Sequence, residues 1–191
     1  MMRRDAKPSR SGDARASRLA LVAELRRLEE QLQRTQGELL ALGGEVLPGL
    51  HLVVEAAGRR GLLAAGRVTE IVRLVAMTPL VGAPRHVLGT FVCRGGPVVA
   101  LDLAAHFGVE REPSLDAQIV ILAGAPALGV VVDRIERLVE SPRLFEGDAA
   151  GATPEGWRGS PLVVGLCVDG GEVLPLVDPA PLAAGVGERA A

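Results

Sequence analysis

The sequence predicts an all-β domain preceded by one long amphipathic α-helix. Short apolar segments of strand length alternate with Gly and Pro residues from Leu50 to Val177. A separate leucine repeat with a helical period occupies residues 17–43. The 191 residues include 24 Gly and 13 Pro but one Trp, three Phe and no Tyr, so we expect Val, Leu, Ile and Ala to fill the core.

The N-terminal part divides into a tail and a helix. Residues 1–16 are mostly polar, and we expect a flexible tail because they have little to bury. From Ser17 the sequence predicts a helix over 17–43, with Ser17 as a candidate N-cap and Gly43 with Gly44 at its end. Its leucines are spaced alternately by four and three residues, and charged residues occupy the other faces. The seam consists of Leu21, Leu25, Leu28, Leu32, Leu39 and Leu42, and Thr35 takes the place of a leucine between Leu32 and Leu39.

Residues 47–185 are predicted to form one β domain, followed by a short flexible C-terminus at 186–191. The expected strands are Leu50–Ala56, Gly61–Ala65, Val68–Leu74, Val87–Cys93, Val98–Leu103, Gln118–Leu122, Leu128–Val132, Leu162–Val168 and Glu172–Val177. Asp169-Gly170-Gly171 is typical of a tight hairpin. We expect brief helical turns within Leu101–Phe107 and near Pro181–Ala184, and a loop over Gly147–Arg158.

Composition and charge argue against several classes of protein. The formal net charge is -2 and the sequence pI is about 6.0, so there is no overall basic field to attract nucleic acid. The apolar runs are far shorter than the ~20 residues of a membrane helix, and no signal peptide is recognisable, so we expect no membrane insertion and no export. The two cysteines, Cys93 and Cys167, favour a reducing cytoplasm over a disulfide framework.

The sequence lacks a recognisable catalytic or cofactor motif. His51, His86 and His106 show no metal-ligand spacing with Cys, Asp or Glu, which favours packed or surface roles. There is no nucleophile elbow, and the glycine pairs lack the Lys-Ser/Thr of a phosphate-binding loop. We therefore expect a protein that is not an enzyme and that holds neither a cofactor nor a metal.

Four polar residues at the ends of apolar runs remain as candidates. Asp102, Asp133 and Asp178 each have an acid-base interpretation, but a turn or cap role is favoured because another element follows each of them. Arg94 stands between an expected strand and Gly95, where it has either an interface role or the role of a solvated turn residue.

Several short motifs follow one another along the expected β domain: Val68-Thr69-Glu70-Ile71-Val72, Thr78-Pro79, Ala83-Pro84 with Gly89, Cys93-Arg94-Gly95, Asp102-Leu103, Phe107-Gly108 and Gly129 to Ile135. Their order resembles the CheW family of chemotaxis coupling proteins, and the resemblance extends from about Leu47 to Ala184. The resemblance implies two five-stranded β-barrels that share one core. It further implies a non-catalytic adaptor that couples the cytoplasmic tip of a chemoreceptor to the regulatory domain of a CheA-type histidine kinase, in the cytoplasm at membrane-associated receptor arrays.

The resemblance also implies site residues. Val68, Glu70, Arg94 and Gly95 match receptor-contact positions in a groove between the barrels, and a kinase-binding surface is expected on the first barrel. Three positions depart from the family pattern. Val92 replaces the usual Asn, Val99 replaces Pro, and Arg137 stands where an acid is common.

Two questions stay open from the sequence. The N-terminal helix has three interpretations: packing on its own barrel, a coiled coil with a second copy, or pairing with helices of a receptor or another partner. An alternative function is a regulatory β-barrel that binds a small ligand or another signalling protein, with Asp102 or Asp133 as a polar anchor and the helix mediating self-association.

Overall fold

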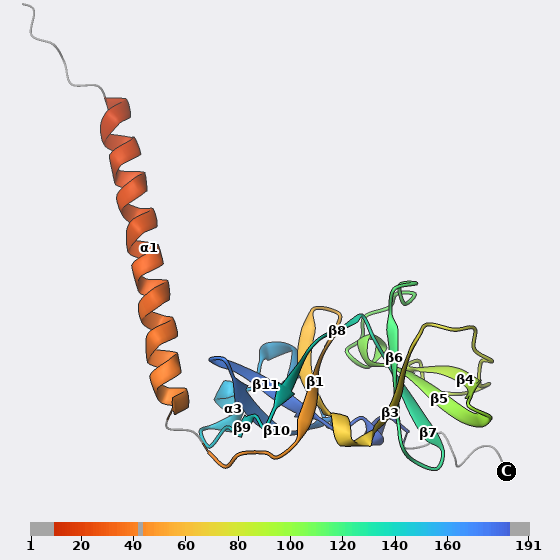
Figure 1. The fold of residues 1–191 in the computed structure, drawn as a ribbon. Helices are drawn as coiled ribbons and strands as arrows, with labels where there is room; N and C mark the ends of the chain where they lie inside the picture. Colours follow the sequence, from red (N-terminus) through yellow and green to blue (C-terminus); the bar gives the residue numbers. More distant parts are fainter. Residues whose placement is uncertain (1–9, 42–43, 184–191) are drawn as a thin grey trace, which may run out of the picture. The chain divides into compact units, whose positions relative to one another are not determined.

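The computed structural model describes residues 10–41 and 44–183 (Figure 1). Helix side chains are described from Arg18 to Thr35. The chain divides into two compact units, residues 1–42 and 43–191, each described by itself below. Some of the predictions fall outside the described residues. They concern residues 1–9 of the expected tail, the C-terminus at 186–191, and Leu42 and Gly43 at the end of the expected helix. The side chains of Ser17 and Leu39 are not described either.

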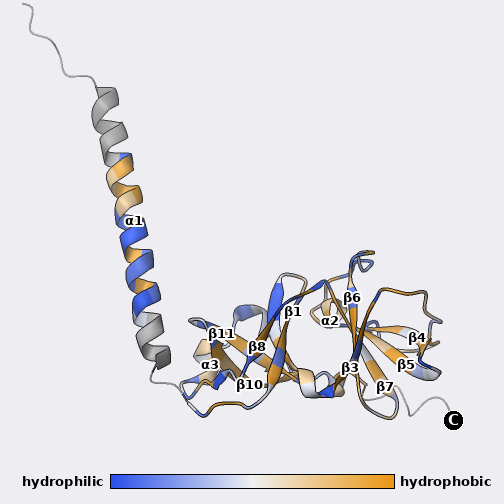
Figure 2. Ribbon diagram, viewed as in Figure 1, coloured by the Kyte–Doolittle hydropathy of each residue, from blue (hydrophilic) through white to orange (hydrophobic). Residues whose placement is uncertain are grey.

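Helix α1 (Arg10–Ala41) makes up the described part of the first unit. It begins at Arg10 and not at Ser17, so residues 10–16, which we expected in the tail, continue the helix; Ala and Arg, which are frequent there, are strong helix formers. Hydrophilic and hydrophobic residues are interleaved along α1 (Figure 2). No helix among the described residues has both the length and the apolar character needed to cross a membrane.

The second unit contains two β-sheets. The first sheet has the strand order β8-β1-β2-β11-β10-β9, and the second has the order β3-β6-β7-β5-β4. The bounds are β1 (Leu50–Ala56), β2 (Arg59–Ala64), β3 (Val68–Arg73), β4 (Val87–Cys93), β5 (Gly96–Asp102), β6 (Gln118–Leu122), β7 (Ala127–Val132), β8 (Arg134–Glu140), β9 (Arg143–Leu144), β10 (Val163–Asp169) and β11 (Glu172–Val177). All neighbouring strands are antiparallel except β11 with β2 and β5 with β7.

Backbone contacts link the edges of each sheet and curl it toward a barrel. In the first sheet, the segment leading into β1 bridges β9 through Val46 and Arg143. In the second sheet, Thr78, which follows β3, bridges Thr90 of β4, and each amide donates to the other's carbonyl at 2.8 Å. These contacts leave fewer free backbone groups at the sheet edges.

One apolar core lies between the two sheets, and each sheet also encloses a smaller one. Along β1, Leu52 and Val54 face the shared core, whereas Val53 faces the core of the first sheet. Along β6, Val120 faces the shared core and Ile119 faces the core of the second sheet. The middle of β1, Leu52–Val54, and most of β6, Ile119–Leu122, are therefore buried on both faces, which explains why these stretches are continuous apolar runs (Figure 2).

The fold confirms the prediction of two small barrels on one shared core and differs from it in detail. Strands β8 and β9 were not predicted, and the first sheet has six strands. The expected loop Gly147–Arg158 contains α3 (Ala149–Ala152) and the 3-10 helix η2 (Glu155–Trp157). Trp157 is only 1% exposed and is the largest fully buried side chain, so the core is not built from aliphatic residues alone.

The remaining short helices lie where helical turns were expected or next to β3. Helix α2 spans Leu103–His106, η3 spans Ala180–Ala183, and η1 (Ala65–Arg67) directly precedes β3. The first two coincide with the expected turns, and η1 sets the start of the strand that borders the candidate site.

Candidate functional site

A two-residue hairpin carries Arg94 and Gly95 between β4 and β5. Cys93 pairs with Gly96 across the ladder, and Arg94 and Gly95 have φ angles of 47° and 82°. Positive φ at both central residues is the geometry that matches the twist of the flanking strands. Gly95 adopts it without steric cost, whereas Arg94 does not. The hairpin presents the Arg94 side chain at its tip, where 80% of it is exposed.

Arg94 and Cys93 both contact Glu70 on the opposite edge strand of the second sheet. Arg94 Nε donates to Glu70 Oε2 at 2.7 Å, and the Cys93 thiol donates to the same oxygen at 3.2 Å. The hydrogen bond from Arg94, followed by that from Cys93, lowers the pKa of Glu70. The same carboxylate, first through its hydrogen bond, raises the pKa of the Cys93 thiol. The structure thus brings together two predicted site residues, Glu70 and Arg94, that lie far apart in sequence.

Glu70 and Arg94 line an open groove of about 620 Å³ between β3 and β4, here called the edge groove. Its lining is Glu70, Val72, Val75, Ala76, Thr78, Thr90, Phe91, Val92, Cys93, Arg94 and Pro97. Apart from the Glu70–Arg94 pair, most of these side chains are apolar. Sequence reasoning missed Val72 and Phe91, because nothing in the local pattern says that β3 and β4 meet.

A β-bulge at Thr69 separates the two predicted site residues of β3. Val68 pairs with Leu122 and Glu70 pairs with Ile121, so Thr69 is an extra residue in the ladder. Its hydroxyl donates to the Ile121 carbonyl at 3.2 Å. Ile121 and Leu122 are consecutive residues of β6, so they face opposite sides of the sheet, and so do the residues of β3 that pair with them. Val68 therefore packs toward the shared core, while Glu70 faces the edge groove.

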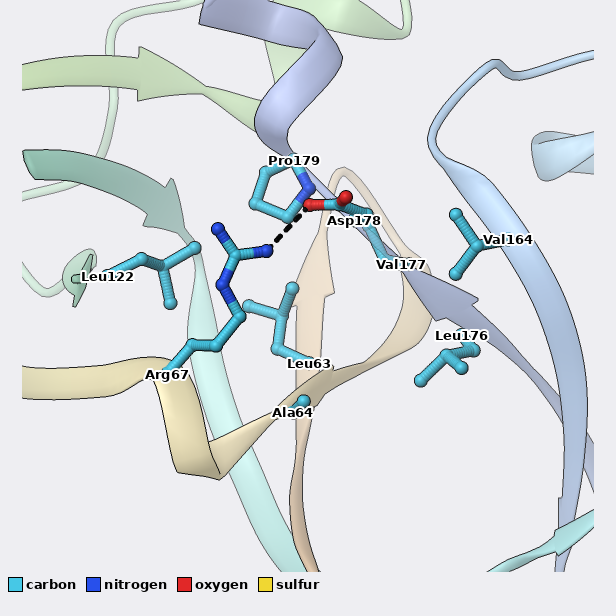
Figure 3. A pocket seen from close by; sticks show the side chains of 9 residues that line it. All are labelled: Leu63, Ala64, Arg67, Leu122, Val164, Leu176, Val177, Asp178 and Pro179. Atoms are coloured by element: carbon cyan, nitrogen blue, oxygen red, sulfur yellow. Dashed lines mark hydrogen bonds and ion pairs between the residues drawn. The ribbon is translucent and has the colours of Figure 1, made fainter. Parts of the chain in front are cut away.

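A second hollow lies where the two sheets meet, here called the junction cavity (Figure 3). Its volume is about 170 Å³, and it is lined by Leu63, Ala64, Arg67, Leu122, Val164, Leu176, Val177, Asp178 and Pro179. Arg67 Nη1 lies 3.1 Å from Asp178 Oδ1 across it. Val68 lines neither hollow: it follows Arg67 and pairs with Leu122, which both line the junction cavity, and it packs against the shared core. Of the predicted receptor-contact residues, Glu70 and Arg94 therefore line the edge groove, whereas Val68 and Gly95 line neither hollow.

The three aspartates at strand ends have structural roles. Asp102 caps α2 by accepting a hydrogen bond from the Ala104 amide at 2.9 Å. Asp133 accepts from the Ala57 amide at 2.8 Å, and Asp178 accepts from the Ala180 amide at 3.0 Å. Asp102 is 3% exposed, and its burial raises its pKa. The local cap interpretation therefore holds for Asp102 and Asp178, each of which accepts from an amide two residues on, whereas Asp133 binds the turn between β1 and β2, 76 positions away in sequence.

The histidines pack against protein groups and do not form a metal site. His51 is buried, and its Nδ1 lies 3.2 Å from the Gly49 carbonyl. His86 Nε2 donates to the Leu182 carbonyl at 2.9 Å, and His106 Nε2 lies 3.2 Å from Ser160 Oγ. Burial lowers the pKa of His106. Within residues 10–41 and 44–183, no three His, Cys, Asp or Glu side chains lie close enough to hold a metal ion.

Arg137, where the family pattern has an acid, is paired in this structure. Arg137 Nη1 lies 2.5 Å from Asp169 Oδ2, and its Nη2 lies 3.9 Å from Glu172 Oε2. Glu172 also pairs with Arg60 of β2. The changed charge therefore joins β8 to the β10–β11 hairpin. The other departures are accommodated as well, since Val99 is buried in the shared core and Val92 lies beside a regular two-residue turn.

The two sheets and their shared core define a double-barrel β protein, and the edge groove and the junction cavity are hollows on its surface. A family model described as the CheW-like domain matches residues 50–186, and the chain belongs to that family. The family comprises non-catalytic scaffold proteins of chemotaxis signalling.

A solved structure has the same fold. The scaffolding protein TtCheW from Thermoanaerobacter tengcongensis superposes with a TM-score of 0.57 at 20% sequence identity, over 69% of this chain and 90% of that one. No curated protein sequence matches the chain. The matched family region begins after α1, so the helix is an addition to the CheW-like domain.

Proposed function

We propose that this chain is a non-catalytic adaptor of a chemosensory array. In this role it couples the cytoplasmic tip of a chemoreceptor to the regulatory domain of a CheA-type histidine kinase, in the cytoplasm beside the membrane that holds the receptor. The observation that carries the proposal is the Glu70–Arg94 pair at the edge groove of a CheW-like domain.

The chemistry of the edge groove suits a protein partner. Arg94 uses its Nε–H on Glu70, which holds the guanidinium in place while its other N–H groups remain available to a partner. Apolar side chains surround the pair, among them Val92, which is 74% exposed. A fixed arginine within an apolar surface is typical of residues that dominate binding energy at interfaces.

The junction cavity provides a second contact area for the receptor in this proposal. Arg67, which lines the cavity, directly precedes Val68 at the start of β3, and Glu70 and Val72 of β3 line the edge groove. A receptor segment that crosses β3 would contact Val68 on one side and the Glu70–Arg94 pair on the other. We place the kinase contact on the first sheet, away from this surface.

The alternative of a small-ligand module has less support. The junction cavity, at about 170 Å³, is smaller than the roughly 300 Å³ at which ligand pockets usually begin, and the edge groove, which is large enough at about 620 Å³, is open to solvent and would not enclose a small ligand. The suggested polar anchors, Asp102 and Asp133, line neither hollow and accept backbone hydrogen bonds instead.

A charge reversal with a matched control tests the adaptor proposal. Arg94→Glu is compared with Arg85→Glu, because both side chains are highly exposed, at 80% and 84%, and each is paired with one glutamate. Each full-length variant is assayed for binding to a purified chemoreceptor cytoplasmic fragment and, separately, to a CheA-type kinase. We expect Arg94→Glu to weaken receptor binding at least about tenfold, which is about 1.4 kcal/mol, and Arg85→Glu to leave it unchanged.

Circular dichroism and thermal unfolding of both variants check that the fold is retained. Equal receptor binding by the two variants would remove the edge groove from the receptor interface. Failure of the unmodified chain to bind either receptor or kinase would contradict the adaptor proposal itself.

A further inference from the structure

The described part of α1 carries an exposed leucine seam. In heptad notation Leu21 and Leu28 occupy d positions, and Leu25 and Leu32 occupy a positions. Their exposed fractions run from 57% to 65%. Helix α1 has 32 residues and is therefore about 48 Å long, enough to pair with another helix over several heptads. A stripe of this kind is buried when a second helix packs along it.

Two polar residues end this run of leucines, and they lie at equal distances from its centre. Arg18 occupies the a position before Leu21, and Thr35 occupies the d position after Leu32. The midpoint between Leu21 and Leu32 falls between residues 26 and 27, and so does the midpoint between Arg18 and Thr35. A two-fold axis at this point, perpendicular to the helix, therefore sets leucine against leucine and polar residue against polar residue.

An antiparallel pair of copies about this axis fills every described layer of the seam. In such a pair each a residue packs beside a d residue of the other helix. The described layers, from the axis outward, are Leu25 with Leu28, Leu21 with Leu32, and Arg18 with Thr35. The leucines then form one continuous apolar block, and each guanidinium lies beside a hydroxyl at an end of that block. The seam is thus complementary to itself.

The residues that flank the seam fit the same pair. In an antiparallel coiled coil, e positions face e positions and g positions face g positions. Glu29, at e, lies beside Val22 of the second copy, and Glu24, at g, lies beside Gln31, whose amide can donate to the carboxylate. Arg15, at the e position before Val22, faces an uncharged glutamine. Within residues 18–35, this pairing opposes no two like charges.

A parallel pair opposes like charges at three places. It sets Arg18, at an a position, against the Arg18 of the second copy. Each g position faces the following e position of the other helix, so Glu24 meets Glu29 and Arg10 meets Arg15. Like charges at such distances are destabilising. The charge pattern therefore selects the antiparallel orientation.

A second antiparallel register, shifted by one heptad, buries fewer leucines. It gains contacts of opposite charge, Arg15 with Glu29 and Arg10 with Glu38, but it sets Glu24 against the Glu24 of the second copy. Only two of its layers pair leucine with leucine, whereas the unshifted register has four. Burial of leucine contributes more than an exposed ion pair, so the unshifted register is favoured.

We infer that α1 binds the α1 of a second copy of this chain in an antiparallel coiled coil, with Leu25 beside Leu28 of the second copy. The β domain follows the C-terminal end of α1, so the pair carries its two CheW-like domains at opposite ends. This contact lies outside the CheW-like region and does not depend on receptor or kinase binding. One dimer therefore holds two edge grooves.

Sedimentation velocity of the full-length chain tests the occupant of the seam. We expect a concentration-dependent dimer with a dissociation constant at or below about 10 μM. Leu28→Gln removes a leucine from both layers beside the axis and should raise that constant at least about tenfold. Leu19→Gln is the matched control, because Leu19 is 66% exposed but occupies a b position away from the seam, and it should leave the constant nearly unchanged. Helical circular dichroism verifies that α1 persists in each variant.

Disulfide cross-linking in a Cys93→Ser background tests the orientation and the register. On oxidation, the double variant Arg18→Cys/Thr35→Cys should form a covalent dimer, because each position lies opposite the other in the pair. Within one helix the two positions are about 25 Å apart, beyond the reach of a disulfide, so the bond joins two chains. The single variants Arg18→Cys and Thr35→Cys should form no covalent dimer. Cys167 is buried and remains in every variant.

Four results would overturn the inference. A chain that stays monomeric at about 100 μM would remove the second copy as occupant. A dimer that Leu28→Gln leaves intact would place the contact on the β domain. A covalent dimer of either single variant would make the pair parallel. Cross-linking of Arg15→Cys/Glu29→Cys, with none of Arg18→Cys/Thr35→Cys, would replace the register with the shifted one. None of these results bears on receptor binding through Arg94, so the adaptor proposal is tested separately.

Discussion

Arg94 Nε donates a hydrogen bond to Glu70 Oε2 across 2.7 Å and thereby joins the two edge strands of the second sheet. The Cys93 thiol donates to the same oxygen, so one carboxylate from β3 receives two donors from the end of β4. In the ladder order three strands, β6, β7 and β5, lie between β3 and β4. The bridge between Thr78, which follows β3, and Thr90 of β4 brings these two edges into contact. The pair exists because the sheet curls.

The shared carboxylate makes the reactivity of Cys93 depend on Glu70. Its hydrogen bond and its charge both raise the pKa of the thiol, so Glu70→Gln should lower that pKa and increase the thiolate fraction near neutral pH. We expect alkylation of Cys93 by iodoacetamide at about pH 8 to become several-fold faster. Mass spectrometry distinguishes Cys93 from the buried Cys167. Glu110→Gln, at a glutamate paired with Arg85, is the control, and an unchanged Cys93 rate in Glu70→Gln would contradict the assignment.

Two neighbouring glycines test the hairpin geometry. Gly95 has φ +82° and open space where the Cβ of an alanine would lie, so Gly95→Ala should destabilise through backbone strain alone, by about 1 kcal/mol. Gly96 lacks a positive φ and has only an ordinary contact, so Gly96→Ala should change the free energy of unfolding much less. Urea denaturation measures both variants. Equal losses would show that Gly95 is not required for its left-handed conformation.

The barrel-closing bridge depends on a third glycine. A Cβ on Gly89 would lie 2.3 Å from the Thr78 carbonyl oxygen, and Gly89 has φ +140°. Gly89→Ala should therefore displace the Thr78–Thr90 bridge and cost at least about 2 kcal/mol. Gly82→Ala is the matched variant, because Gly82 also has a positive φ but open space around it. If thermal unfolding shows the two substitutions to be equally costly, the close approach at Gly89 contributes nothing.

The buried carboxyl of Asp102 predicts a pH effect of definite sign. Burial raises its folded-state pKa above the ordinary 3.8, so the folded protein binds the proton more tightly than the unfolded chain does. This side chain's contribution to stability therefore falls as pH rises from the ordinary pKa through the folded one. Asp102→Asn retains the cap oxygen without the charge, so its stability relative to the unmodified protein should increase between about pH 3 and pH 7.

Chemical denaturation at several pH values measures this difference. Asp102→Ala is the companion variant: it also lacks the carboxyl, so its relative stability should change with pH in the same way, but it should be about 1 kcal/mol less stable than Asp102→Asn at every pH because it loses the helix cap. A stability difference for Asp102→Asn that stays constant with pH would mean that the carboxyl is not destabilised by burial.

Most strands were predictable because burial on both faces leaves a continuous apolar run in the sequence. Gln118–Leu122 and Val87–Cys93 coincide with β6 and β4 at both ends. Strand β8 was missed because it is an edge strand with Arg134, Glu136 and Arg137 among its exposed residues, a pattern that is equally typical of a solvated connection. Trp157 was missed because its surroundings are rich in Gly, Ala and Pro, and only contacts from distant segments bury it.

The candidate site was predictable in part. The hairpin at Arg94 and Gly95 follows from a local turn signal between two apolar runs. The family resemblance added Val68 and Glu70 to the predicted receptor-contact residues, but it placed these two residues in one groove together with Arg94 and Gly95. The bulge at Thr69 directs Val68 and Glu70 to opposite faces of β3, and no local pattern marks that extra residue.

Local chemistry was thus sufficient for the all-β class, the leucine seam of α1 and the turn that carries Arg94, because each depends on residues within a few positions of one another. The Glu70–Arg94 contact, the placement of Val68 outside the edge groove and the burial of Trp157 depend on the tertiary structure. They arise where edge strands distant in sequence are brought together by curvature and register, and the free energy that sets this geometry comes from the shared core and not from the site residues.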